Sequence, residues 1–196
     1  MASVNINNRR DVLLLLLYSP GISGQFNEPI TGRTRLTKLL FLFKTEALEH
    51  FRKGTEITDE NFYQFFPWRF GPFSSQVYDD LTFFILRDFI ATTISNEESL
   101  PESAEEWARW QEEAEGQFQG DVSVYQEETF ILTPKGVKFA EELYASLSSA
   151  QKDLLKSFKL RVANAPLRAL LKYVYKTYPK MTDESEIAGD ILGTDN

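Results

Sequence analysis

Few residues of this chain could carry out covalent chemistry. The 196 residues include no cysteine and a single histidine, His50. Thiolate nucleophiles and disulfides are therefore excluded, and a lone histidine predicts neither a histidine-based metal site nor Ser–His machinery. Paired glutamates occur at 105–106 and 112–113, but no metal-ligand or phosphate-binding pattern accompanies them. We expect no catalytic residue, metal or cofactor, and interpret His50 as a cation near a helix end.

The cationic residues could bind nucleic acid, because lysine and arginine neutralise phosphate charge. One cluster opens the second predicted helix, where the helix dipole disfavours cations and suggests an external role: Arg33, Arg35 and Lys38. Arg9 and Arg10 could add to it. A stripe spaced at i, i+4 and i+8 follows the last predicted helix, with Lys156 and Lys159 on the helix before it: Arg168, Lys172 and Lys176. A solvated surface is the alternative interpretation of both groups, and the stripe could also dock an acidic helix.

An acidic segment carries aromatic residues that could anchor a protein partner. Residues 96–128 hold eleven acidic residues and one basic residue, whereas 134–180 hold ten basic and three acidic residues. Within the acidic segment, Trp107, Trp110 and Phe118 follow one face of a helix that a capping box at 103–106 predicts. Tryptophan is enriched among residues that dominate binding energies. The alternative is that this stripe packs on its own domain.

Hydrophobic periodicity predicts the elements that would position these residues. A helix over 9–18 follows asparagines able to cap it, and a second runs from 34 to Gly54. An extended aromatic segment at 62–70 precedes the third helix. The remaining predictions are a helix at 74–87, strands at 89–94 and 129–132, a helix at 135–146, a helix opened by a capping box at 148–151, and a last helix opened by Asn164 and Pro166.

The aromatic run at 65–74 predicts a junction that sets the angle of the following helix. Gly71 supplies backbone freedom, Pro72 fixes φ, and Ser74 is placed to accept a hydrogen bond from the helix; with Trp68 they form a structural motif. If this helix read DNA, its outward residues would be Ser75, Gln76, Asp79, Asp80, Phe83 and Arg87. The two aspartates would then approach phosphates, so the helix is predicted to bind DNA poorly.

The order helix, helix, helix, strand, strand, helix is that of a winged helix-turn-helix. We predict an α+β, mainly α fold of this type, with an acidic helical insertion in the wing and two extra C-terminal helices. The winged-helix domain would span 1–146 with the insertion at about 96–128, the helical extension 147–180, and an acidic, flexible tail 181–196. The apolar run at 12–18 is too short to cross a bilayer, so we expect a cytoplasmic protein without a membrane partner.

Three blocks of the chain resemble the Panacea, or SocA-like antitoxin, domain and related uncharacterised prokaryotic winged-helix proteins. They lie at 35–42 (RLTKLLFL), 66–74 (FPWRFGPFS) and 132–136 (LTPKG). The resemblance covers about 9–146 and implies a non-enzymatic protein tied to toxin neutralisation, phage defence or gene regulation. Our main hypothesis is an antitoxin-like adaptor that binds a protein, such as a toxin or defence effector. A DNA-binding transcriptional regulator is the alternative, and a homodimer is compatible with either.

Overall fold

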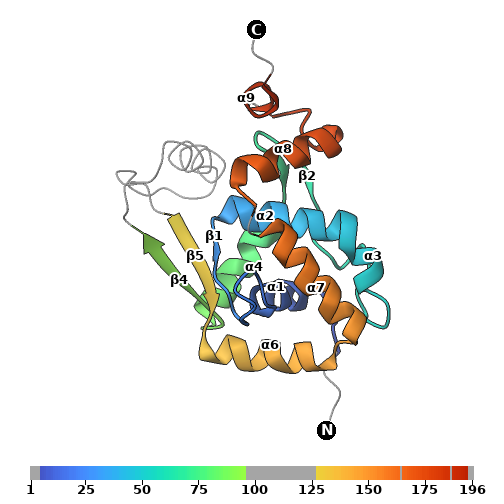
Figure 1. Cartoon of the computed structure of the whole chain (residues 1–196), viewed down its shortest axis with the longest axis vertical. Helices are drawn as coiled ribbons and strands as arrows, with labels where there is room; N and C mark the ends of the chain where they lie inside the picture. Colours follow the sequence, from blue (N-terminus) through green and yellow to red (C-terminus); the bar gives the residue numbers. More distant parts are fainter. Residues whose placement is uncertain (1–4, 96–126, 164, 186, 194–196) are drawn as a thin grey trace.

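The structure, a computed structural model, describes residues 5–95, 127–163, 165–185 and 187–193. Within them the chain forms an α+β fold that is mainly helical, as the sequence predicted. Figure 1 shows an elongated body, with α6 (Pro134–Ser146) at the end near the N-terminus and α8 (Leu167–Thr177) and α9 (Ala188–Leu192) at the other end. The predicted aromatic stripe lies outside the described residues: Trp107, Trp110 and Phe118.

Helix α1 (Arg9–Tyr18) lies in the core and has the bounds that the sequence predicted. The side chain of Asn8 accepts a hydrogen bond from the first turn, and Asp11 accepts one from the backbone N–H of Asn8, which completes a capping box. The apolar run that follows has no exposed surface from Val12 to Leu17. The helix packs against α6, α7 (Ser149–Val162) and β5 (Glu127–Leu132), so this run is a core helix.

The second predicted helix consists of three consecutive parts. Helix α2 (Arg33–Leu42) continues through a π-helical turn (Phe43–Ala47) into α3 (Leu48–Phe51). The Phe43 ring contacts those of Phe51, Phe62 and Phe158, with centroids between 5.2 and 6.2 Å apart. Because Phe158 belongs to α7, this aromatic cluster joins the N-terminal and C-terminal helices in one core.

Two small antiparallel sheets complete the fold of the described residues. In the larger sheet β5 lies between β1 (Ile30–Thr31) and β4 (Ile90–Ser95). The smaller sheet is a hairpin of β2 (Phe66–Trp68) and β3 (Gly71–Phe73), where the sequence predicted an extended segment. Gly71 has a φ of +85°, and a Cβ there would lie 3.1 Å from the Tyr175 ring, so its predicted backbone freedom is required. Helix α4 (Ser75–Leu86) then connects the hairpin to β4.

The C-terminal helices belong to the same hydrophobic core as the rest of the chain. The predicted capping box of α7 is present, since Ser148 and Gln151 bond reciprocally. After α8 a 3₁₀ turn (Pro179–Met181) leads toward α9. The sequence predicts a frayed acidic tail over 181–196, but in its described part residues 188–192 form α9, and Ile187 and Ile191 are buried. Burial of these two isoleucines favours an ordered segment, which its acidic composition did not indicate.

Candidate functional site

Lys38, predicted to bind nucleic acid, is an interior residue. It is 2% exposed, because α2 packs against β3, and its Nζ donates to the carbonyl oxygen of Pro72 at 3.0 Å. The predicted surface position of Lys38 is therefore wrong. Its charge stabilises a carbonyl of the hairpin, and no phosphate could reach it in this structure.

Arg33 and Arg35 bind groups of the protein itself. Arg33 forms an ion pair with Glu128 of β5, in which Nη2 donates to Oε1 at 3.0 Å. Arg35 donates to the carbonyl oxygens of Ala163, at 3.2 Å, and Ala165. These carbonyls lie at the C-terminal end of α7, where the helix dipole favours a cation. The cations at the start of α2 thus bond other elements of the same chain, and these contacts do not support the external role that was predicted for them.

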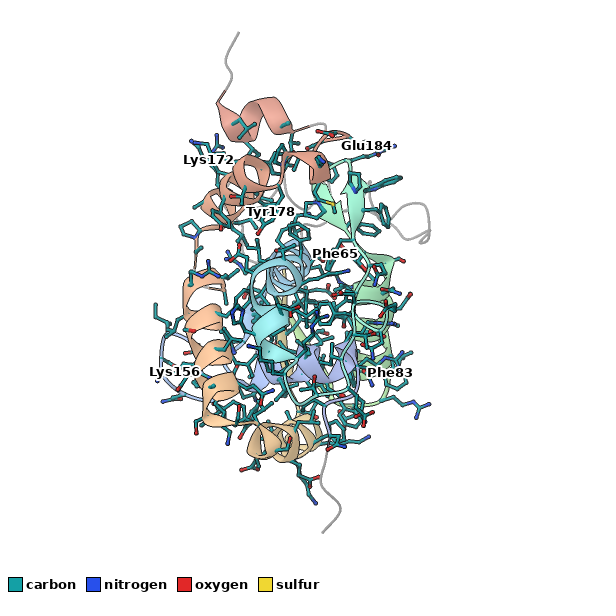
Figure 2. All side chains as sticks on the ribbon, turned by 90° about the vertical axis from the view of Figure 1, so that its right-hand side faces the viewer. Phe65, Phe83, Lys156, Lys172, Tyr178 and Glu184 are labelled. Atoms are coloured by element: carbon teal, nitrogen blue, oxygen red, sulfur yellow. The ribbon has the colours of Figure 1, made fainter. Side chains whose placement is uncertain are left out.

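The two lysines predicted to lie beside the basic stripe have opposite environments. Lys156 is exposed and projects outward from α7 in Figure 2. Lys159 is 1% exposed, and its Nζ donates to the carbonyl oxygens of Leu17 at 2.9 Å and Ser19 at 2.7 Å. Both carbonyls end α1, so the ammonium caps that helix. Burial lowers the pKa of Lys159 to about 8, and the nearby Glu28 carboxylate opposes this shift.

Asp80, predicted to face outward, points into the protein. It is 0% exposed and lies on the buried stripe of α4, where its carboxylate accepts from Arg9 Nε at 2.7 Å and Arg10 Nε at 2.6 Å. The two arginines therefore pair with Asp80 and do not extend the cationic cluster of α2. Burial, and then the charge of Asp80, raises the pKa of Tyr63 well above its ordinary value. The other positions predicted to face outward are exposed or half-buried: Ser75, Gln76, Asp79, Phe83 and Arg87.

The basic stripe on α8 is exposed, as its spacing predicted: Arg168, Lys172 and Lys176. Figure 2 shows Lys172 at the outer surface of this helix. The opposite face of α8 is buried through residues such as Leu171 and Val174. This stripe is the surface on which the DNA hypothesis now depends, since Lys38 is interior and Arg33 and Arg35 have partners within the chain.

A group of exposed aromatic rings covers one side of the β2–β3 hairpin. We call it the aromatic hairpin face; it consists of Phe66, Trp68 and Phe73. Phe66 is 43% exposed, Trp68 is 36% exposed and Phe73 is half-buried. The ring centroids are 6.1 Å apart for Phe66 and Trp68, and 5.5 Å apart for Phe66 and Phe73. Because the rings contact one another, they form one continuous apolar surface.

The rest of the protein supports the hairpin. The carbonyl oxygen of Pro72 accepts from Lys38, and that of Arg69 accepts from Ser185 Oγ at 3.1 Å. The Phe73 ring also contacts Tyr78 of α4, with centroids 5.3 Å apart. Contacts with α2, with α4 and with the segment before α9 therefore hold the hairpin that carries the aromatic hairpin face.

The structural motif predicted in this region is partly confirmed. Gly71 and Pro72 are buried at the start of β3, directly after the turn, but Trp68 is exposed. Ser74 occupies the N-cap position of α4, yet its buried Oγ makes no hydrogen bond with the described residues, so the predicted cap is wrong. The spacing of Phe66 and Trp68 by two residues could have indicated a shared strand face. Pairing across the turn, which sets Phe73 opposite Phe66, was not visible in that spacing.

Comparison with protein-family models, curated proteins and solved structures finds no significant match. The resemblance to the Panacea domain therefore stays a prediction from three blocks of sequence. Among the described residues, no three or more acidic or histidine side chains are grouped so as to hold a metal ion. In the same part of the chain, no helix combines the length and apolar character needed to cross a membrane.

Proposed function

We propose that the protein is a non-enzymatic adaptor of the winged-helix type that acts by binding another protein, with the aromatic hairpin face as its docking surface. The observation that carries this proposal is the exposure of Phe66 and Trp68 in mutual contact. Large exposed rings that form a continuous surface are typical of binding sites. Aromatic side chains are also the residues that most often dominate the energy of protein interfaces.

The resemblance to the Panacea domain favours a toxin or a defence effector as the partner. Two of the three blocks that carry this resemblance, 35–42 and 66–74, meet in the structure, where Lys38 of one bonds Pro72 of the other at 3.0 Å. The stretches of sequence that suggest an antitoxin-like protein therefore build the docking surface and its support.

The order of elements supports the winged-helix type. Helix α1, strand β1 and helix α2 precede α4, β4 and β5, and β5 pairs with both other strands of the sheet. The hairpin β2–β3, which carries the exposed rings, lies between α3 and α4. The surface of α4 exposes Asp79, which would repel phosphates. Protein binding is therefore better supported than insertion of α4 into a DNA groove.

Capture of partners on the purified protein, including proteins encoded by neighbouring genes, tests the proposal. Trp68→Ala and Phe66→Ala should each weaken binding about tenfold or more, because truncation of an aromatic anchor costs about 2 kcal/mol. Leu86→Ala is the matched control, since Leu86 is 80% exposed on α4 and lies outside the aromatic hairpin face. Circular dichroism and thermal unfolding should be unchanged in all three variants. Full binding by Trp68→Ala would contradict the proposal.

A DNA-binding regulator is the second candidate, favoured by the exposed cations along α8. This function predicts binding to duplex DNA that weakens as salt is added, because each phosphate contact releases counterions. Replacing the stripe by glutamates should abolish the binding: Arg168→Glu, Lys172→Glu and Lys176→Glu. A protein that fails to shift duplex DNA even at low salt would not have this function.

A further inference from the structure

Among the described strands, β4 lies at the edge of its sheet, and its sequence has none of the residues that usually protect such an edge. It occupies the outer position in the sheet order β1-β5-β4, and Figure 1 shows it at the margin of the molecule. Its six residues, IATTIS, include no charge and no proline. Natural edge strands usually carry lysine, proline or a bulge, which prevent pairing with another chain. Ile94 near its end is 48% exposed.

The register shows which backbone groups of β4 point away from the sheet. The N–H of Thr133 donates to the carbonyl of Phe89 at 3.0 Å, and Ile90 lies opposite Leu132. Hydrogen-bonded and non-hydrogen-bonded pairs alternate along an antiparallel ladder, so Ala91 and Thr93 direct their N–H and C=O groups toward β5. Three residues direct these groups to the outer edge, where no described strand pairs with them: Ile90, Thr92 and Ile94.

We propose that the protein forms a two-fold dimer in which β4 pairs antiparallel with β4 of a second copy, centred on Thr92. A two-fold axis perpendicular to the sheet keeps side chains on their own face. Because the backbone of Thr92 faces outward, an axis between the two Thr92 residues makes the central pair a hydrogen-bonded one. With Thr92 on the axis, Ile90 lies opposite Ile94 of the second copy, and Thr92 lies opposite its own counterpart. The pairing makes roughly six main-chain hydrogen bonds.

The chemistry of the edge favours an identical strand as its partner. A two-fold axis at Thr92 pairs all three residues whose backbone groups face outward, Ile90, Thr92 and Ile94. It also leaves Asp88 outside the new ladder of hydrogen bonds. It creates two isoleucine pairs and one threonine pair, and cross-strand pairs of these kinds stabilise sheets. Because β4 carries no charge, it has no electrostatic preference for a charged peptide. A second copy of β4 is equally uncharged and has the same length, so the two strands can pair along their whole length. The two sheets then join into one, and this edge is no longer exposed to other chains.

Single cysteines in this cysteine-free chain provide the sharpest test. In the proposed pairing the two Cα atoms at position 92 are about 5.5 Å apart, which lies within the range of about 4.4–6.8 Å that a disulfide spans. Thr93 lies opposite Ala91 of the second copy, so the two positions 93 are displaced by about 7 Å along the strands and cannot be bridged. Under mild oxidation, Thr92→Cys should form a covalent dimer and Thr93→Cys should not.

The exposures of the two positions make this test stringent. Thr93 is exposed and Thr92 is half-buried, so random collisions would cross-link Thr93→Cys faster. Equal or faster cross-linking at position 93 would overturn the proposal, as would a lack of cross-linking at position 92.

The mass in solution is the second measurement. The mass of the wild-type protein in solution should rise with increasing concentration from 22.6 kDa toward twice that value. Thr92→Pro removes one outward N–H without touching the bonds to β5, so it should stay monomeric with an unchanged circular dichroism spectrum. Thr92→Val keeps the N–H and should still dimerise. A wild type that is monomeric at every concentration, or a dimer that survives Thr92→Pro, would count against β4 pairing.

Discussion

The C-terminal helices carry basic residues in similar sequence surroundings, but some of these residues are buried and others are exposed. Lys159 on α7 is enclosed and bonds the carbonyls that end α1, whereas Lys172 and Lys176 on α8 are exposed. The difference does not lie in the residue type. Lys159 has carbonyls of another helix end within its reach, and the α8 lysines project away from the core. A basic residue on an amphipathic helix is therefore weak evidence for a nucleic-acid surface.

Replacing Lys159 should produce the largest effect on stability. Lys159→Met removes the donor that caps α1 and leaves buried carbonyls unsatisfied, so it should lower the free energy of unfolding by about 3 kcal/mol. Lys156→Met on the exposed side of α7 is the matched control, and its effect should stay below about 0.5 kcal/mol. Urea unfolding followed by circular dichroism measures both. Equal effects of the two substitutions would refute the contrast.

Two neighbouring aspartates of α4 allow the same comparison between a buried and an exposed charge, here for anions. Asp80→Asn removes the buried charge that pairs with Arg9 and Arg10, so it should lower the free energy of unfolding by about 2 kcal/mol. Asp79→Asn, at the exposed position beside it, should have almost no effect. Thermal unfolding of the two variants compares them directly, and a similar melting temperature for both would show that the buried pairs contribute little.

The lowered pKa of Lys159 makes its effect depend on pH. Its pKa is 10.5 ordinarily and about 8 in the folded protein, so the unfolded chain holds more protons between these values. Within that window the contribution of Lys159 makes the folded state more stable as pH rises, and below pH 8 the contribution is constant. The stability difference between wild type and Lys159→Met should grow by about 1 kcal/mol from pH 8.5 to 9.5 in urea unfolding. A difference that does not change with pH would mean that the pKa is not lowered.

Charge reversal on α8 should have the smallest effect on stability. Lys172→Glu and Lys176→Glu alter exposed positions, so the free energy of unfolding should change by less than about 0.5 kcal/mol. Differential scanning fluorimetry at low and high salt measures this change. A large loss of stability would show that the stripe holds the fold together, and would remove it as a candidate binding surface.

Local patterns in the sequence were sufficient for most helices. The run from Val12 to Leu17 cannot face water, and Asn8 with Asp11 satisfies the first turn, so α1 follows from nearby residues alone. The capping box of Ser148 and Gln151 set the start of α7 in the same way. The need for glycine at position 71 was also visible from the adjoining turn, and its φ of +85° is a local property of the backbone. These features depend on contacts between residues a few positions apart.

The environment of each charge and ring was decided by the tertiary structure. Lys159 bonds Leu17, which is 142 positions away in sequence, and Asp80 pairs with Arg10, which is 70 positions away. Phe66 and Trp68 share an exposed face because the hairpin packs against α2 with its other side. Periodicity determines which residues share a face of an element, but the packing of distant elements determines whether that face is covered, and burial and pKa follow from this covering.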